Sequence, residues 1–194
     1  MFLSCEQIVS IPDGGQTMYL LKRLFLVSLL ALTLILPVNV YIIGDAIGAA
    51  LQFSFLRYQK TYLGNGVITV LRDLDYITSG IITGRSALSI LLWLCGTLLL
   101  TVAIIYLVAR WREDYESFKK LLSLLVGGAG GAYLLSCIAQ YGPTLHGSAG
   151  FSIPVGVPLI LAVAAYILKA EGMDDELEYA EEGEDDGEGI EEKE

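Results

Sequence analysis

The stretch "LLSLLVGGAGGAYLLSCIAQY", residues 121–141, decides the fold because it holds four glycines inside a long apolar run. Glycine costs about 1 kcal/mol relative to alanine in the interior of a water-exposed helix. In a membrane, small residues instead let two helices approach closely, and close packing is what holds such helices together. The stretch contains no Asp, Glu, Lys, Arg or His. It therefore predicts a membrane-spanning helix with one nearly flat face.

Three further apolar stretches without charged residues cover residues 24–43, 86–109 and 151–168. About 20 apolar residues in a helix are needed to cross about 30 Å of hydrocarbon. Together with residues 121–140, these stretches predict an all-α integral membrane protein with four transmembrane helices, in a transmembrane domain over residues 24–170. The fourth stretch is the shortest. Its Pro158 predicts a kinked helix that starts near Phe151, with Pro154 in the first turn.

The charge is distributed unevenly between the body of the chain and its C-terminal tail. Residues 171–194 carry a net charge of −13, whereas the rest of the chain carries +3. A segment this acidic has almost nothing apolar to bury, which predicts a disordered acidic tail. The tail is interpreted either as a solubilising segment that the membrane repels or as a docking site for a basic cytoplasmic partner. The mildly basic, apolar body is not that of a nucleic-acid-binding protein.

Basic residues in short flanking segments predict the orientation in the membrane. They occur at 22–23, within 110–120 and at Lys169, which places the N-terminal segment 1–23, the 110–120 loop and the C-terminus in the cytoplasm. The protein is thus expected to be a multi-pass protein of the cell membrane, with the 42-residue segment 44–85 as an extracytoplasmic loop. That loop also holds four basic residues, which weakens the orientation argument.

Two alternatives remain open at the N-terminus. The basic pair Lys22 and Arg23 followed by the first apolar stretch resembles a secretory signal peptide, with a cleavage site near Gly48-Ala49-Ala50. The apolar run of about 20 residues is longer than the usual signal-peptide core of about 7–15, so an uncleaved helix is favoured. Met18 is an alternative start of the chain.

The outer loop admits two interpretations over residues 57–83. Apolar residues recur at helical spacing over residues 67–81, which favours an amphipathic helix across the outer ends of the other helices. The rival is a β-hairpin of residues 57–63 and 67–72 around Gly64-Asn65-Gly66, which the β-branched residues favour. Residues 45–56 are expected to extend the first helix or to form a short interfacial helix.

Small residues predict which helix faces pack together. Gly127 and Gly131 are four residues apart in the third helix, and Gly128, Ala132 and Ser136 form the next ridge. In the second helix, the matching candidates are Thr97 and Thr101. Their hydroxyls can donate to a neighbouring helix or back to their own helix. A glycine hinge or a glycine-lined conduit is the alternative, but a conduit needs a polar lining. The strongly polar side chains within the four stretches are Asn39 and Gln140, near the outer ends.

No constellation for catalysis, metal binding or cofactor binding is visible in the sequence. Asp73 and Asp75 are two residues apart and do not share a helix face, so a solvated face is expected. His146 is the single histidine, and the three cysteines Cys5, Cys95 and Cys137 make no disulfide framework. A non-enzymatic protein without cofactor is therefore expected.

The leading functional hypothesis is a structural, accessory or interaction subunit of a membrane assembly. Its partners would be the lipid bilayer and either another membrane protein or further copies of the same chain. The alternative is a small transporter or channel that forms on oligomerisation. Ion-coupled transporters usually place ionisable residues inside the membrane, and the four apolar stretches contain no Asp, Glu, Lys, Arg or His.

Overall fold

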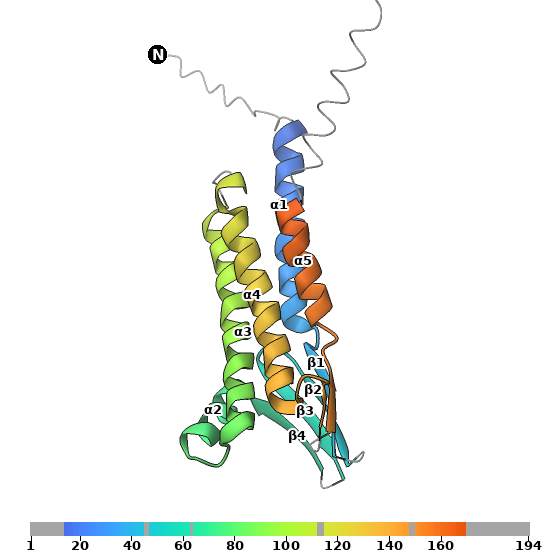
Figure 1. The fold of residues 1–194 in the computed structure, drawn as a ribbon. Coiled ribbons are helices and arrows are strands. Elements are labelled where there is room, and N and C mark those ends of the chain that lie inside the picture. The colour runs from blue at the N-terminus through green and yellow to red at the C-terminus, as the bar shows by residue number, and fades with distance from the viewer. Residues whose placement is uncertain (1–13, 45–46, 63, 112–114, 148–149, 170–194) are drawn as a thin grey trace, which may run out of the picture.

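The computed structural model describes residues 14–44, 47–62, 64–111, 115–147 and 150–169. Four helices lie side by side, and a β-sheet and a short helix lie together at one end of them (Figure 1). The start of the first helix and the end of the last lie at the end opposite the sheet. The predicted N-terminal segment, apart from its last residues, and the acidic tail lie outside the described residues. The long helices are α1 (Gly14–Ile35), α3 (Gly84–Ala109), α4 (Tyr115–Tyr141) and α5 (Val157–Lys169).

The sheet has six antiparallel strands in the order β4-β3-β2-β1-β6-β5. Four of them follow α1 in the chain, and the last two come from the connection between α4 and α5. The strands are β1 (Asn39–Ile43), β2 (Gly48–Gln52), β3 (Leu56–Thr61), β4 (Gly64–Thr69), β5 (His146–Gly147) and β6 (Gly150–Ile153). Because β6 pairs with β1, two segments that are far apart in sequence form one continuous platform.

The prediction of an all-α protein with four transmembrane helices is wrong. The fold is mixed, with helices and a six-stranded antiparallel sheet. Within the described part of the chain, two helices are long and apolar enough to cross a membrane, namely α3 and residues Ser117–Tyr141 of α4. These correspond to the predicted stretches 86–109 and 121–140. The other two predicted spans each divide into a helix and a strand.

The first predicted span, residues 24–43, ends as a helix at Ile35 and continues as strand β1. Pro37 explains the break, because proline offers no N–H for the helix and disfavours helical backbone in the residue before it. The following residues Asn39–Ile43 are rich in β-branched and aromatic side chains, which suit a strand. Their hydrogen-bonding groups are satisfied on both sides, by β2 and by β6.

The fourth predicted span, residues 151–168, also divides in two. Residues Gly150–Ile153 form β6, and the helix α5 begins only at Val157. Pro158 therefore lies in the first turn, where a helix needs no N–H donor, and it does not kink the helix. The 13 residues of α5 extend about 20 Å, less than the thickness of the hydrocarbon layer.

The predicted outer loop contains regular structure along most of its length. Of the two interpretations of residues 57–83, the hairpin is the one that forms, as strands β3 and β4 pair from Leu56↔Thr69 to Thr61↔Gly64. The predicted helix over residues 67–81 is limited to α2 (Val70–Thr78). The expectation of helix in residues 45–56 is wrong where the structure describes them, because Gly48–Gln52 is strand β2. Alternating β-branched residues outweigh the longer helical periodicity here.

The core of the protein lies between the helices and continues to the inner face of the sheet. It is most extensive where α3 faces α4. Its largest fully buried side chains are Trp93, Tyr133, Phe118, Leu30, Leu100, Leu107, Leu122, Ile160 and Ile167. Two aromatic side chains of this core, Trp93 and Tyr133, carry polar atoms that fix the sheet to the helices.

Candidate functional site

The connection between β2 and β3, residues 53–55, is anchored inside the helical bundle. Thr97 Oγ1 on α3 donates to the backbone oxygen of Ser54 at 2.7 Å, and Trp93 Nε1 donates to that of Phe53 at 3.0 Å. The Tyr133 hydroxyl lies 3.1 Å from Thr97 Oγ1 and 3.4 Å from Ser54 Oγ. Hydrogen bonds in a dry interior are strong and costly to break. The sheet is therefore held rigidly on the bundle.

A glycine makes room for this anchor. A Cβ atom at Gly96 would lie 2.9 Å from the Tyr133 ring and 3.1 Å from the backbone oxygen of Ala129. Only glycine at this position lets α3 and α4 approach with the tyrosine ring between them. The sequence shows Gly96 next to Thr97 on the second predicted helix, but a single glycine in an apolar helix gives no sign of which ring it faces.

A reciprocal serine pair joins α3 and α4 nearer the sheet. Ser89 Oγ donates to the backbone oxygen of Ser136 at 2.8 Å, and Ser136 Oγ donates to that of Ser89 at 2.7 Å. Both side chains are buried. These bonds satisfy the hydroxyls and align the two helices just below the sheet.

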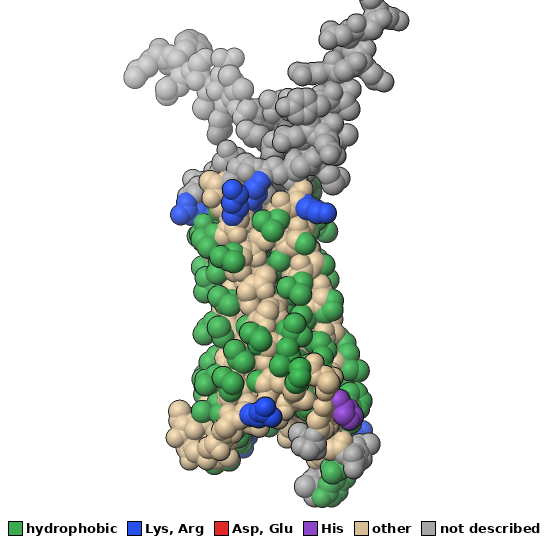
Figure 2. Space-filling model, in the orientation of Figure 1, with side chains coloured by type: hydrophobic (Ala, Val, Ile, Leu, Met, Phe, Trp, Pro, Cys, Tyr) green, Lys and Arg blue, Asp and Glu red, His purple; other side chains and the backbone are tan. Residues whose placement is uncertain are grey.

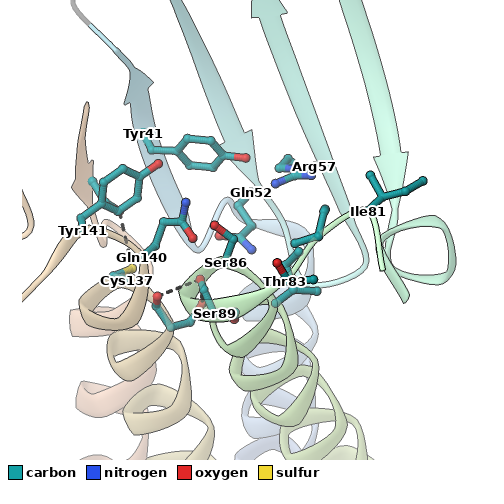
Figure 3. Close-up of a pocket in the computed structure, with 14 residues that line it drawn as sticks. Tyr41, Gln52, Arg57, Ile81, Thr83, Ser86, Ser89, Cys137, Gln140 and Tyr141 are labelled. Carbon is teal, nitrogen blue, oxygen red and sulfur yellow. Dashed lines mark hydrogen bonds between the residues drawn. The ribbon is translucent and has the colours of Figure 1, made fainter. Parts of the chain in front are cut away.

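Between these helix ends and the sheet lies a cavity of about 440 Å³ (Figure 3). Strands β1, β2, β3 and β6 supply one wall, and the start of α3 and the end of α4 supply the other. Most of the lining is polar. The lining residues are Tyr41, Gln52, Arg57, Ile81, Ile82, Thr83, Ser86, Ser89, Ile90, Ser136, Cys137, Gln140, Tyr141 and Ser152.

The strand register explains why the polar residues of the sheet meet in this cavity. Residues directly opposite each other on paired strands share a face, and every second residue along a strand does so too. Tyr41 is paired with Ser152, and Gln52 is paired with Arg57. Because β1 and β2 are in register, all four side chains belong to the inner face of the sheet.

Among the described residues, Arg57 is the one charged side chain that lines the cavity, and a buried carboxylate holds it in place. Arg57 Nη2 on β3 donates to Oδ1 of Asp73 on α2 at 2.8 Å, and Asp73 is completely buried. Burial raises the pKa of Asp73 above 3.8, and the Arg57 charge opposes that rise. The expectation that Asp73 and Asp75 form a solvated face is therefore wrong for Asp73, whereas Asp75 is exposed.

Two buried polar atoms at the cavity have no hydrogen-bond partner within the described part of the chain. They are the hydroxyl of Tyr41, a residue that is only 8% exposed, and Nε of Arg57. The Tyr41 hydroxyl points towards the Arg57 side chain in Figure 3, but the two groups make no hydrogen bond of good geometry. Burial raises the pKa of Tyr41 above 10.0, although the nearby guanidinium opposes the rise. Tyr41 is thus a neutral donor at neutral pH.

The predicted small-residue positions of α4 lie on different surfaces. A Cβ at Gly127 would meet the Ala164 side chain of α5 at 3.6 Å, and one at Gly128 would meet Leu99 of α3 at the same distance. Around Gly131 there is open space, and Ala132 is buried.

The tightest glycine of this stretch is Gly130, which the sequence interpretation did not select. A Cβ there would lie 2.9 Å from the side chain of Leu161 on α5. The helical spacing of the four glycines identifies the faces of α4 but not which face meets a close neighbour.

The predicted threonines of α3 have different partners. Thr97 bonds across to Ser54 and back to the Trp93 carbonyl, whereas Thr101 donates only to the carbonyl of Thr97, at 2.8 Å. Thr97 therefore carries the contact between helix and sheet. Thr101 turns its hydroxyl back on its own helix.

The histidine and two of the cysteines lie apart from one another. His146 is exposed and stacks on Phe151, Cys95 is exposed, and Cys137 is buried beside Ser152. The described residues include no group of three His, Cys, Asp or Glu side chains that could hold a metal ion. Cys5 lies outside the described residues. What the cavity offers is binding by hydrogen bonds, with one guanidinium among hydroxyl and amide groups.

No family model matches this sequence, and none of the curated proteins is significantly similar to it. The cavity is therefore interpreted from its own chemistry.

Proposed function

We propose that this chain is a membrane-embedded interaction protein that binds a small polar molecule in the cavity beneath its sheet. The observation that carries the proposal is a pair of buried polar atoms at a polar cavity, Tyr41 Oη and Arg57 Nε, that have no partner among the described residues. A buried donor without a partner costs about 1–3 kcal/mol. A ligand with an acceptor atom would satisfy both donors at once.

The outer surface of the helices supports the membrane part of the proposal. Large apolar side chains are exposed along α3, including Leu98 at 56% and Ile105 at 62%. Similar side chains are exposed on α1, α4 and α5. Figure 2 shows this apolar band between basic side chains at its two ends. Such a band suits a lipid environment. We infer that α3 and α4 cross the bilayer and that α1 and α5 lie against them within the same apolar layer.

The distribution of basic residues supports an orientation with the sheet on the outer side. The end of the helices opposite the sheet carries the basic residues Arg23, Arg110, Lys119, Lys120 and Lys169. Of the acidic residues in the described ranges, Glu116 of α4 lies at this end. At the sheet end, Asp73 and Asp75 offset two of the four basic residues. By the positive-inside rule, the end opposite the sheet faces the cytoplasm.

The polar side chains deeper in the bundle favour binding over transport, because their hydrogen bonds are already made. The Ser89–Ser136 pair and the Thr97–Tyr133 contact are buried and bonded to one another or to backbone. They close the bundle below the cavity, and the described parts of α3 and α4 carry no ionisable group at that depth other than Cys95, Tyr133 and Cys137. A molecule in the cavity would therefore be held at the outer surface.

The orientation can be tested by cysteine labelling of intact cells, in a background where Cys5, Cys95 and Cys137 are alanine. A membrane-impermeant maleimide should label Lys60→Cys on the sheet and should not label Lys120→Cys until the cells are opened. The reverse pattern would refute the orientation. If neither variant protein is found in the membrane fraction of the cells, the membrane proposal is refuted.

The binding proposal can be tested by native mass spectrometry of the full chain purified in mild detergent. We expect a retained small molecule that is lost in Ser86→Phe, because a ring at this lining position occupies the cavity. Ser28→Phe is the matched control, since Ser28 is exposed on α1. The proposal would be contradicted if the added mass of bound molecules were the same, or zero, in all three proteins and if no anion, cation or polyol of a panel changed their thermal stability.

A further inference from the structure

The geometry points to a ligand class for this cavity: we propose that it binds a phosphodiester, as the headgroup of a phospholipid or as a soluble diester. This inference rests on the function proposed above. Its core is the guanidinium of Arg57 together with the Tyr41 hydroxyl. An oxygen of a phosphodiester can accept from both donors, and arginine is well suited to binding phosphate.

The charges around the cavity favour an anion. Arg57 is the one charged lining residue in the described part of the chain, and no carboxylate joins it at the cavity surface. Asp73 lies behind Arg57, completely buried, and takes one of the five N–H donors of the guanidinium. Asp73 therefore orients the guanidinium, whose Nε makes no hydrogen bond within the described residues.

The start of α3 adds a second positive feature to the same wall. Thr83 and Ser86 both line the cavity, and Thr83 at the N-cap makes no side-chain capping hydrogen bond. The first N–H groups of a helix lack helical partners and carry a partial positive charge. The end of α4 is also near, but the Gly142 N–H caps the carbonyl of Ile138 there at 2.8 Å.

The depth of the cavity matches the headgroup layer of a bilayer. The 26 residues of α3 extend about 39 Å, and hydrocarbon accounts for only about 30 Å of that length. The lining residues of α3 belong to its first two turns, and those of α4 to its last two. With the excess length of α3 at the sheet end, the cavity would lie at the level of the outer-leaflet phosphates.

An apolar strip on the cavity wall suits a molecule that has both a charged and an apolar part. Ile81, Ile82 and Ile90 line the cavity beside the polar residues, and Ile81 is 70% exposed. In Figure 3, Ile81 lies beyond Arg57 and Thr83, at the far edge of the cavity from Tyr141. A glycerol backbone or the start of an acyl chain could rest on this strip while the phosphate contacts Arg57.

The test uses the full chain purified in an uncharged detergent and three probes. Dihexanoyl phosphatidylglycerol carries both the phosphodiester and chains, glycerophosphoglycerol carries the phosphodiester alone, and dihexanoylglycerol carries chains alone. Binding is measured by calorimetry. We expect the first probe to bind and the third to fail. Binding of the second with equal affinity would support the phosphodiester and identify a soluble source. Weaker binding of the second would support a lipid source.

Variants connect binding to the residues. Tyr41→Phe removes a hydroxyl that has no hydrogen-bond partner in the described part of the chain, so the protein should fold. Binding should weaken about tenfold, as for the loss of one charged hydrogen bond. Arg57→Gln alone leaves Asp73 unpaired, so Arg57→Gln with Asp73→Asn is the variant of choice, with a loss at least as large. Tyr58→Phe and Arg72→Gln are matched controls and should bind normally.

Any one of three binding results would overturn the inference, and so would the absence of all binding. They are equal binding of dihexanoylglycerol, unchanged binding in Tyr41→Phe and in the double variant, and binding only of a cation or neutral polyol. In the last case, if Ser86→Phe abolishes that binding, the proposed function stands while the phosphodiester does not. If no compound binds at all, both fail.

Discussion

Arg57 on β3 and Asp73 on α2 form a 2.8 Å ion pair that fixes the β-hairpin to the short helix that follows it. The two partners are not equivalent. Asp73 is completely buried, whereas 20% of the Arg57 side chain is exposed, at the cavity. The carboxylate depends on its partner more than the guanidinium does, since a guanidinium at a polar cavity can still be hydrated.

The first prediction follows from this asymmetry. Arg57→Gln should destabilise the protein by about 3 kcal/mol, because it leaves a buried carboxylate without compensation. Asp73→Asn should cost less, and the double variant should be more stable than Arg57→Gln alone. Denaturant or thermal unfolding in detergent measures all three. Equal, additive losses in the single variants would contradict the proposed asymmetry.

The second prediction concerns the pH dependence of stability. The pKa of Asp73 is raised in the folded state by burial, so the folded protein binds this proton more readily than the unfolded chain. Above pH 3.8, the unfolded chain releases this proton more readily than the folded protein does. The contribution of Asp73 to the free energy of unfolding therefore falls as the pH rises. Relative to Asp73→Asn, the wild type should therefore lose stability as the pH rises from about 4 through the raised pKa of Asp73. Parallel curves for the two proteins would contradict the prediction.

The third prediction separates the glycines by their surroundings. Gly96→Ala and Gly130→Ala should each destabilise by about 1–3 kcal/mol, because the added Cβ would meet the Tyr133 ring or Leu161 at 2.9 Å. Gly131→Ala should be neutral or stabilising by up to about 1 kcal/mol, since open space surrounds it and alanine is the better helix former. Thermal unfolding of the three alanine variants measures these changes in stability. A loss at Gly131 as large as that at Gly96 would show that an unseen partner covers this face.

The sequence predicted α3 and α4 well, α1 and α5 only in part, and the sheet poorly, for a physical reason. Helices such as α3 carry their apolar pattern locally, so that length and composition identify them. Strand β1, by contrast, reads as the continuation of an apolar helix until it is known that β2 and β6 pair with it. The pairing of β6 with β1 joins residues more than a hundred positions apart. No local pattern contains that information.

The cavity was missed for the same reason. Tyr41, Gln52 and Arg57 come from three different strands, and their common face depends on register rather than on sequence spacing. Asp73 gave a partial signal, since its position in the first turn of a helix after a hairpin with an arginine suggests an ion pair. The sequence alone did not show that the carboxylate is buried.

The last prediction concerns the anchor between sheet and bundle. Thr97→Val keeps the shape of the side chain but removes the hydroxyl that donates to the Ser54 carbonyl at 2.7 Å and lies 3.1 Å from the Tyr133 hydroxyl. Both groups are buried, so the variant should lose about 1–3 kcal/mol of stability. Thr101→Val is the matched control and should change little, because its hydroxyl bonds only within its own helix. Hydrogen exchange of β2 and β3 adds a local readout: it should speed up in Thr97→Val and stay unchanged in Thr101→Val. Faster exchange in both variants would mean that the bundle as a whole has loosened. Unchanged exchange in both would mean that strand pairing and Trp93 hold the sheet without the threonine.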